Sequence, residues 1–476
     1  MVTAWPVPPS GRVERSLRDH EEELLATLRE AVRVRMRAEG AVCAHVSGGL
    51  ESSAVAALAT GLARETGGSE PMLVRCVFPG MECDESSHSQ AVADHLRLPI
   101  ASAEMPGELS EYTLNSTRAP RAYFANPVSR MLVRGIETAR GLGARVTLTG
   151  AGSDQLMQAT GYEAADAILR RDARAVLAWS SFWEAPLSRA TYRRIARQGF
   201  GRAVPEQVRR SARALAGQGD GLPAWMTGSA RSAVRRLSVP ALGGGRFDGF
   251  ARLPARRLAT QLWWDPDYTF SIVAADAIGA AHGGELRHPF FDRRVIEMML
   301  RLPAEVRSAG PPAKLFLRRA IGARLPASVA GRTSAAEFSP FVKAALIDAH
   351  GEELSEMMRE SHLADAGLVE PGAVATLVER ARRGEQEVLR EVVTIAALEV
   401  WLRQAASGLL IHGLAPPGPR PRPAHRRGRG RPRVQGAPEP CCDPNGCKSA
   451  PRPRTSRRCT SRGRASSPRR WSTSPA

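Results

Sequence analysis

The chain has 476 residues, 43% of them hydrophobic, and a formal net charge of +19. No apolar run approaches the roughly 20 residues that span a bilayer, and residues 1–10 lack the pattern of a secretory signal, so we expect a cytoplasmic protein without a membrane segment. The charge is uneven: residues 415–476 contain 15 Arg and one Lys against Glu439 and Asp443, so this segment carries +14 and the remaining 414 residues carry +5.

Helical and strand-like patterns alternate through the first third of the chain. The spacing of apolar and β-branched residues predicts strands over residues 41–46, 72–78, 98–101 and 144–149, with helices over 14–39, 54–63, 83–96 and 128–141. This alternation is typical of an α/β fold with a doubly wound, mainly parallel sheet and helices on both faces. Ligands of such sheets collect at the carboxyl ends of the strands.

The remainder of the chain divides into a helical part and a polar tail. Helices are expected over residues 164–179, 189–198, 205–216, 257–262, 293–300, 313–324 and 387–405. The sequence therefore predicts an N-terminal helix and lead-in over 1–40, one domain over 41–410 whose α/β half runs to about residue 160, and a tail over 415–476. The tail is rich in Pro and Arg with almost no apolar content, so we expect it to be disordered.

The stretch from Val46 to Ser53 reads Val-Ser-Gly-Gly-Leu-Glu-Ser-Ser and lies between the first predicted strand and helix. A turn of this kind presents backbone N–H groups and hydroxyls at a helix N-terminus, which is suited to binding phosphate. The adjacent Gly48 and Gly49 allow the backbone to approach a ligand closely. The alternative is an ordinary glycine-rich turn between a strand and a helix.

Further motifs follow in the same order as in a known family. They are Leu-Thr-Gly-Ala-Gly-Ser-Asp-Gln at 148–155, Arg-His-Pro-Phe-Phe-Asp at 287–292, Lys-Leu-Phe-Leu-Arg-Arg-Ala at 314–320 and Arg-Thr-Ser at 332–334. With the Ser-Gly-Gly loop, the chain resembles the synthetase domain of asparagine synthetases and of their relatives, the β-lactam synthetases and lasso-peptide macrolactam cyclases. These are ATP pyrophosphatase domains of the N type. The resemblance covers roughly residues 24 to 332, and more weakly extends to 405.

The resemblance implies that ATP activates a carboxylate as an acyl-adenylate, that pyrophosphate leaves, and that an amine then attacks. The residues implied to bind the nucleotide are Ser47, Gly48, Gly49, Ser52, Ser53, Gly150 and Gly152. Mg²⁺ needs hard oxygen ligands, and Glu51 and Asp154 match the metal ligands of the family. Asp154 could instead serve only as a turn or N-cap residue. Lys314 and Arg332 are the candidates for the catalytic cation.

Two departures from the family concern the beginning of the chain and the loop. Glutamine-hydrolysing asparagine synthetases carry a catalytic cysteine as residue two of an amidotransferase domain, whereas residue two here is Val2, so that domain is not expected in this chain. We therefore expect no glutamine hydrolysis within this chain. Glu51 replaces the loop aspartate, which keeps the charge but moves the carboxylate outward by one methylene. Since magnesium demands near-octahedral geometry, this change could shift the metal.

Other departures lie in the downstream motifs. Ala151 stands where asparagine synthetases carry a glutamate that helps to handle ammonia, and Gln155 replaces the usual acid that follows. The smaller Ala151 side chain leaves room for a larger or different nucleophile. Ser334 occupies the usual position of the catalytic lysine, two residues after an arginine, so Lys314 would have to substitute for it.

The candidates also have plainer structural interpretations. Lys314 could be a solvated helix residue, and Arg332 could simply bond a nearby carboxylate. Arg287 and Asp292 are expected to form a structural ion pair. We expect His288 to take part in packing rather than in catalysis.

The sequence thus predicts an ATP-dependent ligase of the asparagine-synthetase type that uses ATP and Mg²⁺ and a small-molecule or peptide carboxylate. One alternative is a natural-product cyclase that forms a macrolactam or a β-lactam with an amine of the substrate itself. Another is a degenerate protein that binds nucleotide without turnover. A separate amidotransferase or a precursor peptide could be the partner, and the sequence does not determine the oligomeric state. The tail has only Trp471 for base stacking, so a nucleic-acid partner is not expected.

Overall fold

The computed structural model describes residues 16–105, 127–157, 163–176, 222–234, 266–302, 304–307, 314–333 and 336–406, with five single positions between 193 and 208. The chain divides into two units, Met1–Leu414 and Ala415–Ala476, and every described residue belongs to the first. The expected disordered tail, Ser334 and the helices expected over 189–198, 205–216 and 257–262 lie wholly or almost wholly outside the described residues. Within these residues no helix is long and apolar enough to cross a membrane.

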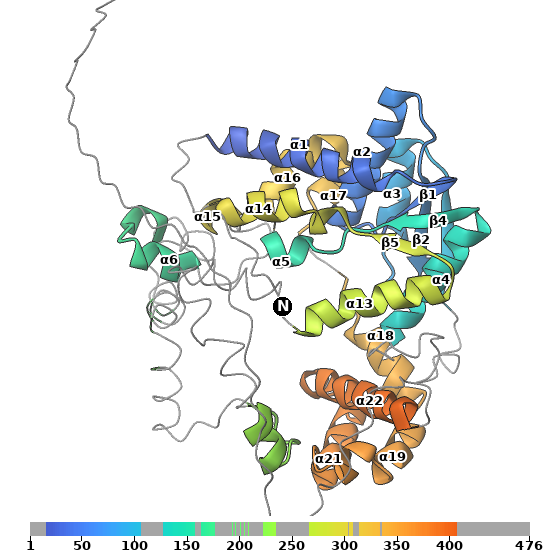
Figure 1. The fold of residues 1–476 in the computed structure, drawn as a ribbon, viewed down its shortest axis with the longest axis vertical. Coiled ribbons are helices and arrows are strands. Elements are labelled where there is room, and N and C mark those ends of the chain that lie inside the picture. Colours follow the sequence, from blue (N-terminus) through green and yellow to red (C-terminus); the bar gives the residue numbers. More distant parts are fainter. Residues whose placement is uncertain are drawn as a thin grey trace, which may run out of the picture. The chain divides into compact units, whose positions relative to one another are not determined.

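A parallel sheet organises the first half of the domain, as the sequence predicted (Figure 1). Its strands are β1 (Ala41–His45), β2 (Met72–Val77), β3 (Ile100–Glu104), β4 (Ala144–Leu148) and β5 (Glu285–Arg287), in the order β3-β2-β1-β4-β5. All described pairings between neighbouring strands are parallel. Ala44 of β1 lies opposite Leu148 of β4, so the segments that follow these two strands leave the sheet side by side.

Helices cover both faces of the sheet, which confirms the α/β fold. The helices of this part are α1 (Leu17–Arg35), α2 (Leu50–Thr66), α3 (Ser86–Leu96), α4 (Pro127–Gly141), α5 (Ser153–Met157), α6 (Glu163–Leu169) and α13 (Pro266–Ala281). Helix α4 contacts β2, β3 and β4, and α13 contacts α4 and β5. On the other face, α2 contacts β1, α3 contacts β2, and α1 packs on α2 (Figure 1).

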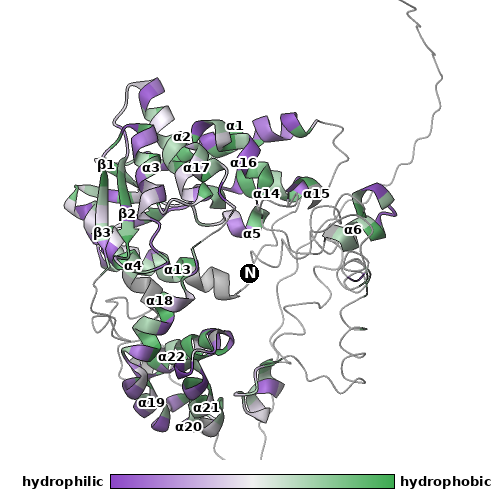
Figure 2. Ribbon diagram, turned by 180° about the vertical axis from the view of Figure 1, so that it is seen from behind, coloured by the Kyte–Doolittle hydropathy of each residue, from purple (hydrophilic) through white to green (hydrophobic). Residues whose placement is uncertain are grey.

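The largest hydrophobic core lies between the sheet and the helices on the α1 and α2 side. Helix α2 contributes Val55, Ala56 and Leu58, which are all nearly inaccessible, and β4 contributes Leu148. Small residues dominate α2, which allows the helix to approach the sheet closely. Figure 2 shows β1 and β2 as largely hydrophobic, in agreement with strands buried on both faces.

The structure departs from the predicted elements at several places, of which β5 and the end of α6 are two. Strand β5 was not predicted, because its three residues, Glu285–Arg287, have neither an apolar run nor a clear alternation. The helix expected over 164–179 is interrupted after Leu169, where Arg171 adopts a left-handed conformation with φ 60°. A left-handed residue cannot continue an α-helix, so α6 ends there.

The second half of the described domain is helical, as predicted. Its elements are η3 (Pro289–Phe291), α14 (Arg293–Arg301), α15 (Ala304–Arg307), α16 (Leu315–Ile321), η4 (Gly322–Arg324), α17 (Ala327–Ala330), α18 (Ser339–Lys343), the π-helical turn η5 (Ala344–Asp348), α19 (Gly351–Arg359), α20 (His362–Asp365), α21 (Pro371–Arg382) and α22 (Gln386–Ala406). Helices α21 and α22 pack together around a second core that includes Leu377, Val392 and Ile395. In contrast, α14 and α16 pack on α1, so these two helices belong to the α/β half.

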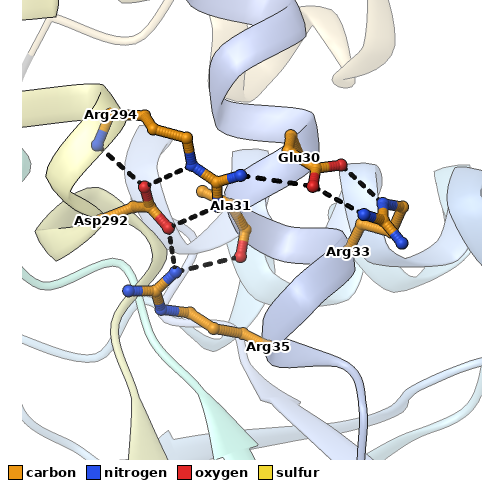
Figure 3. Close-up of polar contacts among 6 residues, drawn as sticks. All are labelled: Glu30, Ala31, Arg33, Arg35, Asp292 and Arg294. Atoms are coloured by element: carbon orange, nitrogen blue, oxygen red, sulfur yellow. Dashed lines mark hydrogen bonds and ion pairs between the residues drawn. The ribbon is translucent and has the colours of Figure 1, made fainter.

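Asp292 joins α14 to α1 through a group of ion pairs (Figure 3). Its carboxylate accepts hydrogen bonds from the side chain of Arg35 at 2.6 Å and from that of Arg294 at 2.8 Å, and it caps α14 through the Arg294 N–H. Burial opposes ionisation, but these donors outweigh it and hold the pKa of Asp292 well below its usual range. The predicted pairing of Arg287 with Asp292 is wrong, because Arg287 binds Glu285 and the backbone carbonyls that end α1.

Candidate active site

The Ser-Gly-Gly loop leaves β1 and enters α2 through a turn held by its own hydroxyl groups. The Ser47 N–H donates to Ser52 Oγ at 3.1 Å, the two hydroxyls lie 2.9 Å apart, and Ser53 Oγ donates to the Gly49 carbonyl at 2.6 Å. Gly48 has φ 83°, and a Cβ there would lie 2.6 Å from His88 Cβ, so only glycine fits. The serines therefore shape the turn, and their predicted contact with nucleotide remains a prediction.

The N-terminus of α2 lies at the carboxyl edge of the sheet. Its N-cap residue is Gly49, which has no side chain to bind the first N–H groups of the helix, and the helix runs for 17 residues. Free N–H groups and the helix dipole give this end a partial positive charge that favours an anion. Glu51 lies in the first turn, so a carboxylate stands beside this anion-binding end.

The second glycine turn, residues 150–152, packs directly against the first. A Cβ at Gly150 would lie 2.6 Å from the Ser52 nitrogen, so the absence of a side chain allows the contact between β4 and α2. Gly152 has φ 106°, and its α-carbon packs on the ring of Phe291. The turn then enters α5, with Asp154 in the first turn of that helix. The structure thus brings together the two predicted glycine turns.

Lys314 bridges the two predicted metal ligands. Its Nζ contacts Glu51 Oε1 and lies 2.6 Å from Asp154 Oδ1. The Lys314 side chain is only 15% exposed, so it is not the solvated helix residue that was one interpretation of the sequence. Ser153 Oγ donates a further hydrogen bond to Glu51 at 3.3 Å. The backbone of Lys314 is left-handed, with φ 61°, at the N-cap of α16; such conformations in non-glycine residues gather at functional sites.

Burial shifts the pKa values of Lys314 and Asp154, and the contacts between their charges oppose these shifts. Burial, and after it the nearby Arg318 guanidinium, lower the pKa of Lys314 to about 8. The two carboxylates act in the opposite direction, since an anion in contact favours the protonated amine, so the side chain stays charged at neutral pH. Burial also raises the pKa of Asp154, and its contact with the ammonium opposes that change. Lys314 therefore neutralises an otherwise repulsive pair of carboxylates.

Arg332 lies with a different carboxylate. Its guanidinium pairs with Glu85, the N-cap residue of α3, and both side chains are largely buried. This agrees with the plainer interpretation of Arg332, although its Nε has no hydrogen-bond partner in the described part of the chain. After burial, the positive charge of Arg332 lowers the pKa of Arg318, as Arg318 does for Lys314. In the described interactions Arg332 contacts neither Glu51 nor Asp154.

The carboxylate pair fits a magnesium ion in its donor chemistry. Glu51 and Asp154 offer hard oxygens that already converge on one cation, the ammonium of Lys314. Among the described residues no group of three or more His, Cys, Asp or Glu side chains could hold a metal ion. Two carboxylates with phosphate oxygens and water are an ordinary ligand set for Mg²⁺, whereas a structural zinc site needs more protein ligands.

Thr149 and Glu85 were not among the site residues predicted from the sequence. Thr149 directly follows β4, and its hydroxyl lies 2.6 Å from His288 Nδ1. Glu85, the partner of Arg332, was not singled out either. A polar residue directly after an apolar strand is the signal that could have identified Thr149, because such residues reach the ligand-binding edge of a parallel sheet.

Comparison with known proteins identifies the family to which the chain is similar. The family model described as asparagine synthase matches residues 23–403. Proteins from Mycobacterium bovis and Mycobacterium tuberculosis named "Putative asparagine synthetase (glutamine-hydrolyzing)" are 25% identical over 410 residues, which cover 80% of this chain and 57% of each relative. The chain thus spans only 57% of the length of these curated relatives. A solved U34-tRNA thiolase from Methanococcus maripaludis, with 11% identity over 52% of this chain and 80% of its own, has a TM-score of 0.22, too low to carry an argument.

Proposed function

The chain belongs to the asparagine synthase family, and on this premise we propose that it is an ATP-dependent ligase that joins a carboxylate to an amine. The single observation that carries the proposal is the convergence of Glu51, Asp154 and Lys314 beside the N-terminus of α2. Three elements far apart in the sequence supply these side chains. Together they offer an anion-binding helix end, two hard-oxygen donors and one fixed cation.

In the proposed reaction the phosphates of ATP bind at the start of α2. The N–H groups there and the glycines of both turns allow close approach of phosphate oxygens. Glu51 and Asp154 would hold Mg²⁺, with phosphate oxygens and water completing its ligands. Magnesium, when bound, neutralises negative charge on the phosphates. Lys314 contributes a further positive charge on the same side, which would stabilise the pyrophosphate as it leaves.

We propose that the carboxylate is activated as an acyl-adenylate, with release of pyrophosphate, before the amine attacks. The amine could be ammonia from a separate amidotransferase or an amine within a peptide or small-molecule substrate. The intact grouping of Glu51, Asp154 and Lys314 favours an enzyme over a protein that only binds nucleotide, because the substitution of glutamate for aspartate still leaves its carboxylate within reach of the shared cation.

The proposal is tested by exchange of labelled pyrophosphate into ATP, measured with Mg²⁺ and a panel of carboxylates that begins with L-aspartate. Exchange that requires both Mg²⁺ and one of the carboxylates would support adenylation. Binding of ATP without exchange for any carboxylate would contradict the enzyme and support the non-enzyme alternative. Addition of ammonium or hydroxylamine to an active pair then reports whether a free amine is accepted.

A further inference from the structure

Thr149, His288 and Asp276 form a row at the carboxyl edge of the sheet, each on a different element. Thr149 follows β4, His288 follows β5, and Asp276 lies on α13. Thr149 Oγ1 lies 2.6 Å from His288 Nδ1, and His288 Nε2 lies 3.7 Å from Asp276 Oδ1. The His288 side chain is only 10% exposed, and its Nε2 has no hydrogen-bond partner among the described residues. A buried imidazole between a hydroxyl and a carboxylate is a grouping that can move a proton.

The Ala151 N–H donates to Thr149 Oγ1 at 3.3 Å, and a hydroxyl oxygen that accepts one hydrogen bond can still donate its own hydrogen to His288 Nδ1. In the tautomer that this donation requires, His288 carries its hydrogen on Nε2, on the side of Asp276. Burial lowers the pKa of His288, so the imidazole is neutral near pH 7 and its Nδ1 lone pair can accept a proton. The Asp276 carboxylate opposes that shift and would stabilise the imidazolium once formed.

The row begins next to the proposed active site. Thr149 directly precedes Gly150, whose α-carbon packs against the first turn of α2. Residues 150–152 read Gly-Ala-Gly and carry no side chain that could accept a proton. The hydroxyl of Thr149 is therefore a proton-accepting group beside the turn that leads to Asp154, and His288 stands directly behind it.

We propose that Thr149 and His288 form a proton relay for the amine that attacks the activated carboxylate, with Asp276 as the counter-ion. This inference rests on the proposed function. The amine nitrogen forms a bond to the acyl carbon, the bond from that carbon to the AMP oxygen breaks, and AMP leaves with the electron pair. The amine proton passes to Thr149 Oγ while the Thr149 hydroxyl proton passes to His288 Nδ1, and the imidazolium later returns its proton to solvent.

The alternative role for His288 is only to position the turn of residues 150–152. Its ring packs edge to face on Phe291, with centroids 5.9 Å apart, and Phe291 in turn packs on Gly152. The two roles differ in which half of the reaction they affect. A positioning residue would influence adenylation and amide formation alike, because Asp154 follows the turn. A proton relay affects only the second half, in which the amine takes part.

The test therefore measures both halves separately: pyrophosphate exchange with a carboxylate active in the wild type, and hydroxamate formation from that carboxylate with hydroxylamine. His288→Gln keeps a hydrogen-bond acceptor for Thr149 but cannot be protonated, and Thr149→Val removes the hydroxyl. We expect hydroxamate formation to fall about 100-fold in both variants, with exchange unchanged within about threefold. Thr149→Ser, which restores a hydroxyl, should recover most of the lost rate.

His282→Gln is the matched control, because His282 is also buried and also lies beside a carboxylate, at 3.5 Å from Glu137, but outside the row. It should leave both rates within about twofold, as a substitution away from the reacting groups does. A parallel fall of exchange and hydroxamate formation in His288→Gln, or no fall in either, overturns the relay while the ligase proposal stands. Absence of exchange in the wild type overturns the ligase proposal and the relay with it.

Discussion

The ammonium of Lys314 lies 2.6 Å from Asp154 Oδ1 and also contacts Glu51, so that one cation serves two carboxylates from different helices. The shared positive charge offsets the repulsion between the two carboxylates, since like charges near one point disfavour each other. The lysine begins α16 in a left-handed conformation, and α16 packs on α1. The packing of α16 therefore determines whether the positive charge reaches the glycine turns.

Replacement of Lys314 should strongly reduce turnover in a protein that still binds ATP. In Lys314→Ala we expect pyrophosphate exchange to fall about 100- to 1,000-fold, since a fixed positive charge on the leaving pyrophosphate is removed. Lys343→Ala is the control: this lysine pairs with Asp348 at the surface, and its loss should change the rate less than about twofold. ATP binding by calorimetry should persist in Lys314→Ala. Unchanged exchange would remove Lys314 from its proposed role.

Gly152 should be intolerant of any side chain. Its φ of 106° is rare for other residues, and a Cβ would lie 2.9 Å from the Phe291 ring. Gly152→Ala should lower the free energy of unfolding by about 1–3 kcal/mol. Exchange should fall about 10- to 100-fold because Asp154 is displaced.

Gly61→Ala, in the same domain, should stabilise the fold, whereas Gly152→Ala should destabilise it. Gly61 lies inside α2, its φ is not positive, and a methyl group added there would meet no heavy atom within 4 Å. Alanine there should raise the free energy of unfolding by about 0.5–1 kcal/mol in denaturant titrations. Equal effects of the two substitutions would contradict the backbone argument for Gly152.

Asp292 should make the free energy of unfolding depend on pH in the acid range. Its folded-state pKa lies below that of an unfolded aspartate, so the carboxylate stabilises the fold above about pH 4 and loses this effect as pH falls through the lower folded value. Asp292→Asn keeps a good N-cap but removes the charge, and should cost about 1.5–3 kcal/mol at pH 7. The variant should also lose part of the acid-induced decline in thermal stability below pH 4.

Asp348→Asn serves as the comparison for Asp292. Asp348 also binds a cation, Lys343 at 2.7 Å, but half of its side chain is exposed. Its replacement should cost less than about 1 kcal/mol at pH 7. A similar cost for both aspartates would mean that the partial burial of Asp292 does not strengthen its ion pairs.

The tail is expected to be dispensable for the chemistry. Residues 415–476 form a unit separate from residues 1–414 and carry most of the net positive charge. A protein that ends at residue 414 should retain exchange within about twofold, since charge runs of this kind are usually solvated. Intact-mass analysis should precede the assay to establish that the tail is present in the wild type. A large loss on deletion would show that the tail contributes to the site.

Local pattern was sufficient for most of the sheet and for the two glycine turns. The apolar runs predicted β1, β2 and β4, the rule that ligands gather at the carboxyl ends of parallel strands placed both turns at one edge, and the resemblance to the family pointed to Glu51 and Asp154. The boundary of the third strand was less accurate: residues 98–101 were expected, whereas β3 runs from Ile100 to Glu104. Strand β5 was missed, because three residues carry too little periodicity to distinguish a strand from a loop.

The partners of charged residues could not be predicted from local sequence pattern. Arg287 and Asp292 are close in sequence and opposite in charge, yet Arg287 binds Glu285 of its own strand and the Arg35 carbonyl, and Asp292 binds the Arg35 side chain. Arg332 was a candidate for the catalytic cation, and its pairing with Glu85 was not predicted. A long charged side chain can reach several neighbours, and the packing of the helices and strands determines which neighbours lie within its reach.

By itself, the sequence determined the α/β class, the two glycine turns and the presence of acidic residues beside them, because strand periodicity and glycine turns are local properties of a chain. Only the tertiary structure decided the strand order, the contact of Lys314 with both carboxylates and the row from Thr149 to Asp276. These features join elements that are distant in sequence. Their geometry follows from how helices pack on the sheet, which no local pattern specifies.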